Sequence, residues 1–247
     1  MDWFAAVDIY CERTSAAFWA EPVNALTNLA VLGPVVWAVS TARRLGERDP
    51  AVWVLIGLGA AIGAGSFLFH TVATRWTEVA DTLPIWSFLA LYAFVGSARL
   101  LGLKPARRHA AALAVVAALV LVFFANGEGA VRAADALPEA DALNGSGQYL
   151  PVFLGVVVFV AGVWWHKHPM RRWVSAAALA FALAVTLRSI DAAACTDLPL
   201  GTHFLWHLFN CLTLGLALQA LLRSPVGVKM KRPPLAHPSL PGAMHRR

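Results

Sequence analysis

Seven separate stretches of the chain are almost entirely apolar, and each is long enough to cross a lipid bilayer as a helix. They cover residues 22–41, 51–72, 82–101, 110–126, 149–165, 173–190 and 203–222, which is 17–22 residues each. About 20 helical residues span a hydrocarbon core of ~30 Å. A backbone in lipid must satisfy its own hydrogen bonds, and continuous runs of this length do so as helices. The sequence therefore predicts an all-α fold, a bundle of seven transmembrane helices.

The balance of residue types supports a membrane protein. Hydrophobic residues make up 59% of the 247 residues and charged residues 14%, whereas soluble domains carry about 25% charged residues. The net charge of +6 would suit a nucleic-acid partner. However, the basic residues are scattered in short loops between apolar runs, which is typical of membrane topology. We therefore expect a lipid bilayer as partner, and neither a nucleic acid nor a protein partner.

The distribution of basic residues also predicts an orientation. Alternate loops place sixteen lysines and arginines on one side and three on the other. The positive-inside rule then puts the N-terminus outside and the C-terminus in the cytoplasm. We expect an outer head (1–21), a seven-span domain (22–222) and a disordered basic cytoplasmic tail (223–247). The Ala- and Arg-rich composition suggests a bacterial protein, in which the outer side would face the periplasm from the inner membrane.

Three histidines are predicted to meet at the outer ends of the spans. His203 and His207 are four residues apart and so share one helix face, while His70 ends the second span. Asp81 lies directly before the third span, at a similar depth. Three neutral imidazoles with an open fourth position form a common catalytic zinc site. Spacing alone does not separate zinc from another transition metal.

Two further side chains suit hydrolysis at such a site. Asp81 can act as a general base toward water, and the hydroxyl of Ser66, one turn before His70, can donate to a developing oxyanion. Polar residues in membrane helices also join helices by hydrogen bonds without any chemistry. Ionisable groups at membrane depth are costly, however. The convergence of several such groups at one level therefore favours a metal site.

These residues resemble a known family. The pattern Ser66…His70, Asp81 and His203…His207 is similar to that of a seven-span hydrolase superfamily that includes the alkaline ceramidases and the adiponectin-receptor and haemolysin-III-like proteins. The head resembles the alkaline ceramidase family in particular, as a bacterial member. It carries the ceramidase-like sequence Tyr10-Cys11-Glu12 and the pattern Glu21-x-x-Asn24-x-x-x-Asn28. The resemblance covers about residues 8–222.

The resemblance implies a reaction and roles for the residues. His70, His203 and His207 would bind zinc, Asp81 would activate water, and Ser66 would stabilise the transition state. The implied reaction is hydrolysis of the amide of a ceramide-like lipid to a sphingoid base and a fatty acid. Tyr149, at the start of the fifth span, is a further candidate for this site.

The head of the family also binds calcium, which prefers oxygen ligands. By resemblance, Asp8, Glu12 and Glu21 would supply carboxylates and Tyr10 a backbone carbonyl. The match to the family departs at two positions around Cys11. A helix cap with surface acids is therefore the alternative interpretation of these residues.

Two more pairings are predicted at the outer side. Cys11 and Cys195 each match a family cysteine, so the resemblance implies a disulfide between them, in an oxidising compartment. Arg188 and Asp191 are three residues apart and are expected to form an ion pair.

Two other functions compete with the amidase. The first alternative is a seven-span receptor or sensor with a structural zinc ion and no turnover. A metal transporter is disfavoured because the candidate ligands lie at one depth only.

Overall fold

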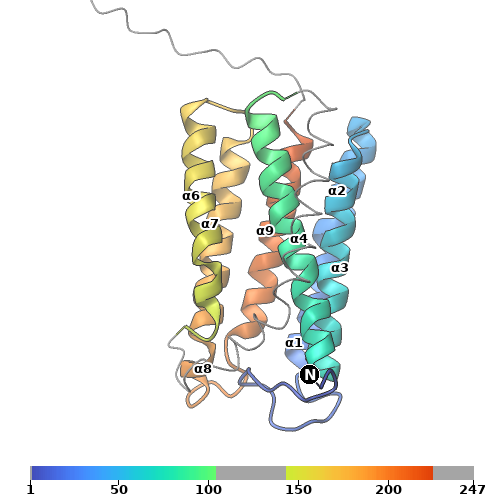
Figure 1. The fold of residues 1–247 in the computed structure, drawn as a ribbon, viewed down its shortest axis with the longest axis vertical. Coiled ribbons are helices and arrows are strands. Elements are labelled where there is room, and N and C mark those ends of the chain that lie inside the picture. The colour runs from blue at the N-terminus through green and yellow to red at the C-terminus, as the bar shows by residue number, and fades with distance from the viewer. Residues whose placement is uncertain (1, 104–142, 225–247) are drawn as a thin grey trace, which may run out of the picture.

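The computed structural model describes residues 2–103 and 143–224, and these form a bundle of long helices lying side by side (Figure 1). The elements are α1 (Pro22–Thr27), the 3-10 turn η1 (Asn28–Val31), α2 (Leu32–Leu45), α3 (Pro50–Val72), α4 (Arg75–Leu100), the 3-10 turn η2 (Ser146–Tyr149), α6 (Leu150–Trp165), α7 (Arg171–Ser189), α8 (Asp191–Ala194) and α9 (His203–Leu222). Residues 2–21, the head, lie across one end of the bundle, here called the head end.

The predicted all-α fold is confirmed for the described residues. Five segments within the described residues are long and apolar enough to cross a membrane: Pro22–Leu45, Pro50–Val72, Arg75–Leu100, Ser146–Trp165 and His203–Leu222. Helix α7 matches the predicted sixth span and packs along α9, but it is not among these five segments. The predicted fourth span, 110–126, and the tail from 225 onward lie outside the described residues. The number of seven spans and the orientation stay predictions.

Helix α4 begins seven residues before the predicted third span. The first helical residue is Arg75 rather than residue 82, so Asp81 lies within the helix and not before it. The prediction followed the apolar run and missed a polar start signal. The Thr77 hydroxyl accepts a hydrogen bond from the N–H of Thr74, 2.9 Å away, as in a capping box.

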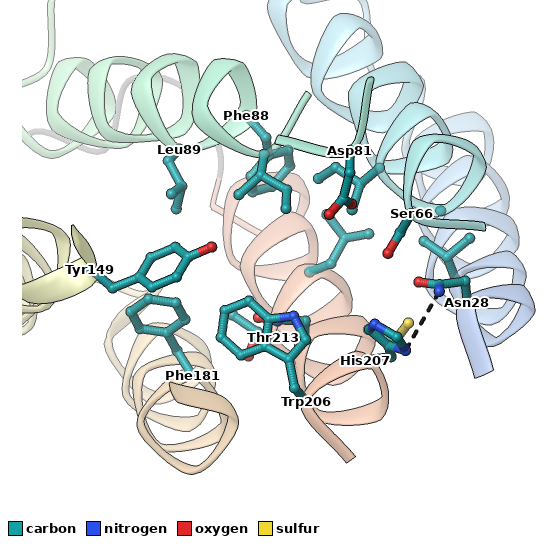
Figure 2. A pocket seen from close by; sticks show the side chains of 17 residues that line it. Asn28, Ser66, Asp81, Phe88, Leu89, Tyr149, Phe181, Trp206, His207 and Thr213 are labelled. Carbon is teal, nitrogen blue, oxygen red and sulfur yellow. Dashed lines mark hydrogen bonds between the residues drawn. The ribbon is translucent and has the colours of Figure 1, made fainter. Parts of the chain in front are cut away.

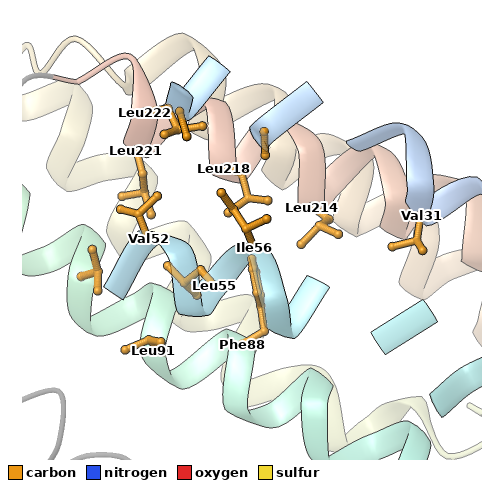
Figure 3. Packing of buried hydrophobic residues seen from close by; sticks show 13 residues of the cluster. Val31, Val52, Leu55, Ile56, Phe88, Leu91, Leu214, Leu218, Leu221 and Leu222 are labelled. Carbon is orange, nitrogen blue, oxygen red and sulfur yellow. The ribbon is translucent and has the colours of Figure 1, made fainter. Parts of the chain in front are cut away.

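The largest apolar cluster of the described residues lies mainly in the half of the bundle remote from the head. Leucines of the second half of α9 interlock with residues of α2, α3 and α4 (Figure 3). The central members are Val52, Leu55, Ile56, Phe88, Leu91, Leu218 and Leu221. Close packing of this kind, rather than exclusion of water, holds helices together in lipid.

Candidate metal centre

Three histidine rings meet inside the protein at the head end. His70 lies in the last turn of α3, and His203 and His207 lie in the first two turns of α9. Their ring centroids are 4.6, 4.7 and 5.1 Å apart, and no residue of the three is more than 4% exposed. One ring nitrogen of each lies within 4.8 Å of the other two. The predicted cluster is therefore formed, and it can hold one metal ion.

Each of these histidines has a buried ring nitrogen without a hydrogen-bond partner in the described part of the chain. These atoms are His70 Nε2, His203 Nδ1 and His207 Nε2. A buried polar atom left unpaired costs about 1–3 kcal/mol, so three in one place call for a ligand. Imidazole nitrogens suit zinc, copper, iron and nickel. The donor set therefore fits a transition-metal ion, and zinc is one that it fits.

The opposite ring nitrogens of two of these histidines are held by other side chains. Nδ1 of His70 lies 2.6 Å from Oε2 of Glu21. Nδ1 of His207 lies 2.9 Å from Oγ1 of Thr27 and 3.5 Å from Nδ2 of Asn28. Metal-binding histidines commonly use one nitrogen for the metal and the other for such a partner. The partners fix the ring orientations so that both Nε2 atoms remain available to a shared ligand.

The first turn of α9 is positioned by the carboxylate of Asp191. Its Oδ1 accepts from the N–H groups of Thr202 (2.6 Å) and His203 (2.9 Å), and its Oδ2 from that of Cys11 (3.3 Å). Gly201 is required beside it, because its φ is +64° and an added Cβ would lie 2.1 Å from Oδ1. The predicted Arg188–Asp191 ion pair is therefore wrong, since this carboxylate caps the helix that carries two of the histidines.

Arg188 instead supports the site through aromatic rings and neutral oxygens. Its guanidinium donates to the carbonyl of Asn144, to Ser146 Oγ at 3.2 Å and to Tyr10 Oη at 3.3 Å. Its Cζ atom lies 5.7–6.0 Å from the ring centroids of Tyr10, Trp206 and Tyr149. Burial raises the pKa of the Tyr10 phenol, which therefore stays protonated. The Tyr10 ring in turn stacks on His203 at a centroid distance of 3.5 Å.

Asp81 comes close to the site because α4 approaches α3 closely at this level. A Cβ added to Gly65 would lie 2.1 Å from the carbonyl oxygen of Ala80 and 3.1 Å from Asp81 Cα. Pro84 has no N–H to donate to that carbonyl, which leaves it free to face α3. Asp81 Oδ1 is buried without a hydrogen-bond partner among the described residues. Glycine at position 65 is thus what lets this carboxylate stand next to Ser66.

A cavity of about 90 Å³ lies beside His207. Asp81, Ser66 and His207 border one side of it, and the Tyr149 hydroxyl points in from the other (Figure 2). The remaining lining is mostly apolar and includes Ile62, Ile85, Phe88, Leu89, Phe181, Trp206 and Leu214. The structure thus brings both predicted catalytic residues, and the further candidate Tyr149, to one chamber. Such a chamber, apolar with a few convergent polar groups, is typical of small-molecule sites.

The head residues predicted to bind calcium do not form a common site. Both carboxylate oxygens of Glu12 accept backbone N–H groups, from Val23 at 2.7 Å and Asn24 at 2.8 Å. Glu12 therefore caps α1, as the alternative interpretation expected. Asp8 is exposed, whereas Tyr10 is buried.

Glu21, the third predicted calcium carboxylate, belongs to the histidine cluster. Its oxygens are bonded to Arg13 Nε (2.5 Å), His70 Nδ1 (2.6 Å) and Asn24 Nδ2 (3.1 Å). Burial raises the pKa of Glu21, but the hydrogen bonds from His70, Asn24 and Arg13 outweigh burial and hold its pKa below the usual range. With Glu12 and Glu21 both occupied, the structure does not support the predicted calcium site.

The predicted disulfide between Cys11 and Cys195 is present, and it links positions 184 residues apart. It ties the head to the connection between α8 and α9. A second attachment joins the head to the turn between α3 and α4, where the N–H of Val7 donates to the carbonyl of Ala73 at 2.9 Å. The head is therefore fastened on both sides of the histidine cluster.

Sequence reasoning missed the residues that hold the histidines. Arg13 was not singled out, and Thr27 and Glu21 were not assigned to the cluster. A signal was present, because Glu21, Asn24, Thr27 and Asn28 recur at intervals of three and four residues. That spacing places polar groups on one face of an otherwise apolar helix. The face lies toward the start of α9, which only the tertiary structure reveals.

Comparison of the chain with protein-family models, with curated proteins and with solved structures gives no match.

Proposed function

We propose that this protein is an intramembrane zinc-dependent amidohydrolase that cleaves the amide of ceramide-like lipids to a sphingoid base and a fatty acid. The observation that carries the proposal is a set of unpaired buried atoms, of which those of His207 and Asp81 belong to residues lining the cavity. Three imidazoles each leave a ring nitrogen without a partner in the described part of the chain, and the Asp81 carboxylate leaves Oδ1 without one there. A site built only to join helices would satisfy these atoms with one another.

The residues around the cavity suit the steps of amide hydrolysis. A zinc ion held by three histidines would supply Lewis acidity and lower the pKa of water to about 7. Asp81 would accept the proton of the attacking water and pass it to the leaving amine. Ser66 and Tyr149 would donate hydrogen bonds from opposite sides of the cavity to the developing oxyanion.

The setting of the cavity favours a lipid substrate. It lies between helices that are long and apolar enough to cross a membrane, and most of its lining is apolar. A molecule that already resides in the bilayer reaches such a site most readily. The choice of ceramide among lipid amides rests on the resemblance of the head. In the proposed topology the site opens toward the periplasmic side of a bacterial inner membrane.

The test is fatty-acid release from labelled ceramides by purified protein in detergent, with zinc content measured on the same samples. We expect Asp81→Asn to retain zinc and to lose activity by about 10²–10⁴-fold, as for a general base. His203→Ala should lose both zinc and activity. If zinc-loaded wild-type protein and His203→Ala release equally little fatty acid, the amidase proposal is wrong. Bound zinc without turnover would instead favour the receptor or sensor with a structural metal.

A further inference from the structure

Arg13 is a buried cation that contacts Glu21, the outer partner of the metal centre, meaning the side chain bonded to the ring nitrogen of His70 that faces away from the other histidines. It is 7% exposed and donates to three oxygen atoms: Glu21 Oε1 at 2.5 Å, the carbonyl of Ser15 at 3.1 Å and the carbonyl of His70 at 3.2 Å. One carboxylate and two backbone carbonyls are also the kinds of ligand that a calcium ion prefers. In this chain a guanidinium occupies that set of oxygens.

The surrounding groups leave little for a second cation to bind. Glu21 uses Oε1 for Arg13 and Oε2 for His70 and Asn24. Glu12 uses both of its oxygens to cap α1. A calcium ion at this place would have to displace the guanidinium and break hydrogen bonds that are already made.

We propose that Arg13 is the permanent cation of the head, taking the place of a calcium ion, and that with Glu21 it forms a positioning pair for His70. The proposal rests on the metal site of the proposed function. Glu21 accepts the Nδ1–H of His70, so the lone pair of Nε2 faces the other two histidines. Arg13 also binds the His70 carbonyl and thereby holds both the ring partner and the backbone of one metal ligand.

The test measures metal binding and needs no enzyme activity. Full-length protein in detergent is stripped of metal and titrated with zinc chloride, with and without millimolar calcium chloride. Calcium chloride alone is titrated in parallel. We expect wild-type protein to bind zinc equally well in both media and to show no calcium binding. Arg13→Met and Glu21→Gln should each weaken zinc binding by about 10–100-fold, as loss of an outer partner does at other metal sites.

The controls separate positioning from folding. Asp8→Asn removes an exposed acid that was predicted to bind calcium, and it should leave zinc binding unchanged. The absorption spectrum of the cobalt-loaded protein should shift in Arg13→Met and Glu21→Gln but not in Asp8→Asn. If Arg13→Met does not yield folded protein by size-exclusion chromatography, the isosteric Glu21→Gln still tests the positioning pair. The calcium titrations of wild-type protein still test the role of Arg13 as the cation.

The outcomes for the two proposals differ. Calcium binding to wild-type protein, or zinc binding that calcium strengthens, would overturn the role of Arg13 as the cation. Zinc affinity within twofold of wild type in Glu21→Gln would overturn the positioning pair while leaving the amidase proposal intact. Failure of wild-type protein to bind zinc at all would reject the metal site and both proposals with it.

Discussion

Both ends of the bundle bury charged side chains, but they pair them differently. At the end remote from the head, Arg99 Nη2 lies 3.3 Å from Glu47 Oε2 and 3.4 Å from Asp49 Oδ2, and Nη1 binds the carbonyl of Leu221. Only Nε of this guanidinium lacks a partner among the described residues. The arginine joins α4 to the α2–α3 connection and to α9. Nearly all of its donors have partners, so we interpret Arg99 as a structural clamp between these elements.

At the head end, some of the buried polar groups have hydrogen-bond partners in the described residues and others do not. Arg13 and Glu21 are matched, and Glu21 in turn holds His70. The free ring nitrogens of the three histidines lie close to one another and have no partner among residues 2–103 and 143–224. A buried charge by itself therefore does not indicate function. A functional site is indicated by unpaired polar atoms that lie close together on side chains whose other polar atoms are held by hydrogen bonds.

The strongest test of this contrast is removal of one histidine. His207→Ala should weaken zinc binding by at least about 100-fold, because a metal ligand contributes more than an outer partner. The measurement is zinc content by atomic emission after dialysis against a chelator. Leu208→Ala, an exposed neighbour on the same helix, is the control and should retain the metal. Equal zinc content in both variants would show that His207 is not a metal ligand.

Removal of Arg99, at the end remote from the head, should lower stability without lowering zinc content. Arg99→Met removes the guanidinium that contacts Glu47 and Asp49, and loss of one partner of a buried pair costs about 3–5 kcal/mol. We expect a large loss of stability in thermal unfolding in detergent, with zinc content unchanged. Arg44→Met, on the exposed end of α2, should change stability by no more than about 0.5 kcal/mol. Zinc loss in folded Arg99→Met would mean that the two ends are coupled.

A smaller effect is expected where α3 and α4 touch beside the site. Gly65→Ala would place a methyl group 2.1 Å from the Ala80 carbonyl, and overpacking of this kind costs about 1–3 kcal/mol. The forced separation of α3 and α4 would also move Asp81. Amidase activity should therefore fall even in the fraction of the protein that remains folded. Gly57→Ala is the matched control, since nothing lies within 4 Å of its added Cβ. It should be neutral or stabilising by up to about 1 kcal/mol.

The smallest expected effect concerns the second outer partner. Thr27→Val removes the hydroxyl beside His207 Nδ1 and should weaken zinc binding by about 10-fold. Thr27→Ser keeps the hydroxyl and should bind zinc like wild type. Zinc titration of the two purified variants distinguishes them. Equal affinity in both would show that the Thr27 hydroxyl is not needed to orient the ring.

Much of the site could be predicted because it depends on local patterns. The i,i+4 spacing of His203 and His207 places both rings on one helix face whatever lies around them. Alternating spans then put His70 at the same end of the bundle. The predicted start of α4 is too late because the helix begins with a polar turn capped by Thr74 and Thr77, and this turn is not part of the apolar run.

The pairing of charges could not be predicted, because local spacing favours the wrong partners. Arg188 and Asp191 are neighbours in sequence, yet Asp191 caps α9 and Arg188 lies among Tyr10, Tyr149 and Trp206. The Asp191 carboxylate instead accepts charge-assisted hydrogen bonds from the backbone N–H groups of Thr202 and His203 at the start of α9. Which donors are within reach is a property of the packed chain.

The sequence by itself determined that this protein is helical, has segments fit to cross a membrane, and places three histidines at one level. Apolar runs, helix periodicity and the alternation of spans are enough for those conclusions. Only the tertiary structure decided which groups support the histidines: Glu21 with Arg13 behind His70, Thr27 behind His207, and Tyr10 on His203. Such contacts form between segments distant in sequence, so their geometry depends on close packing, as at Gly65, rather than on any local pattern.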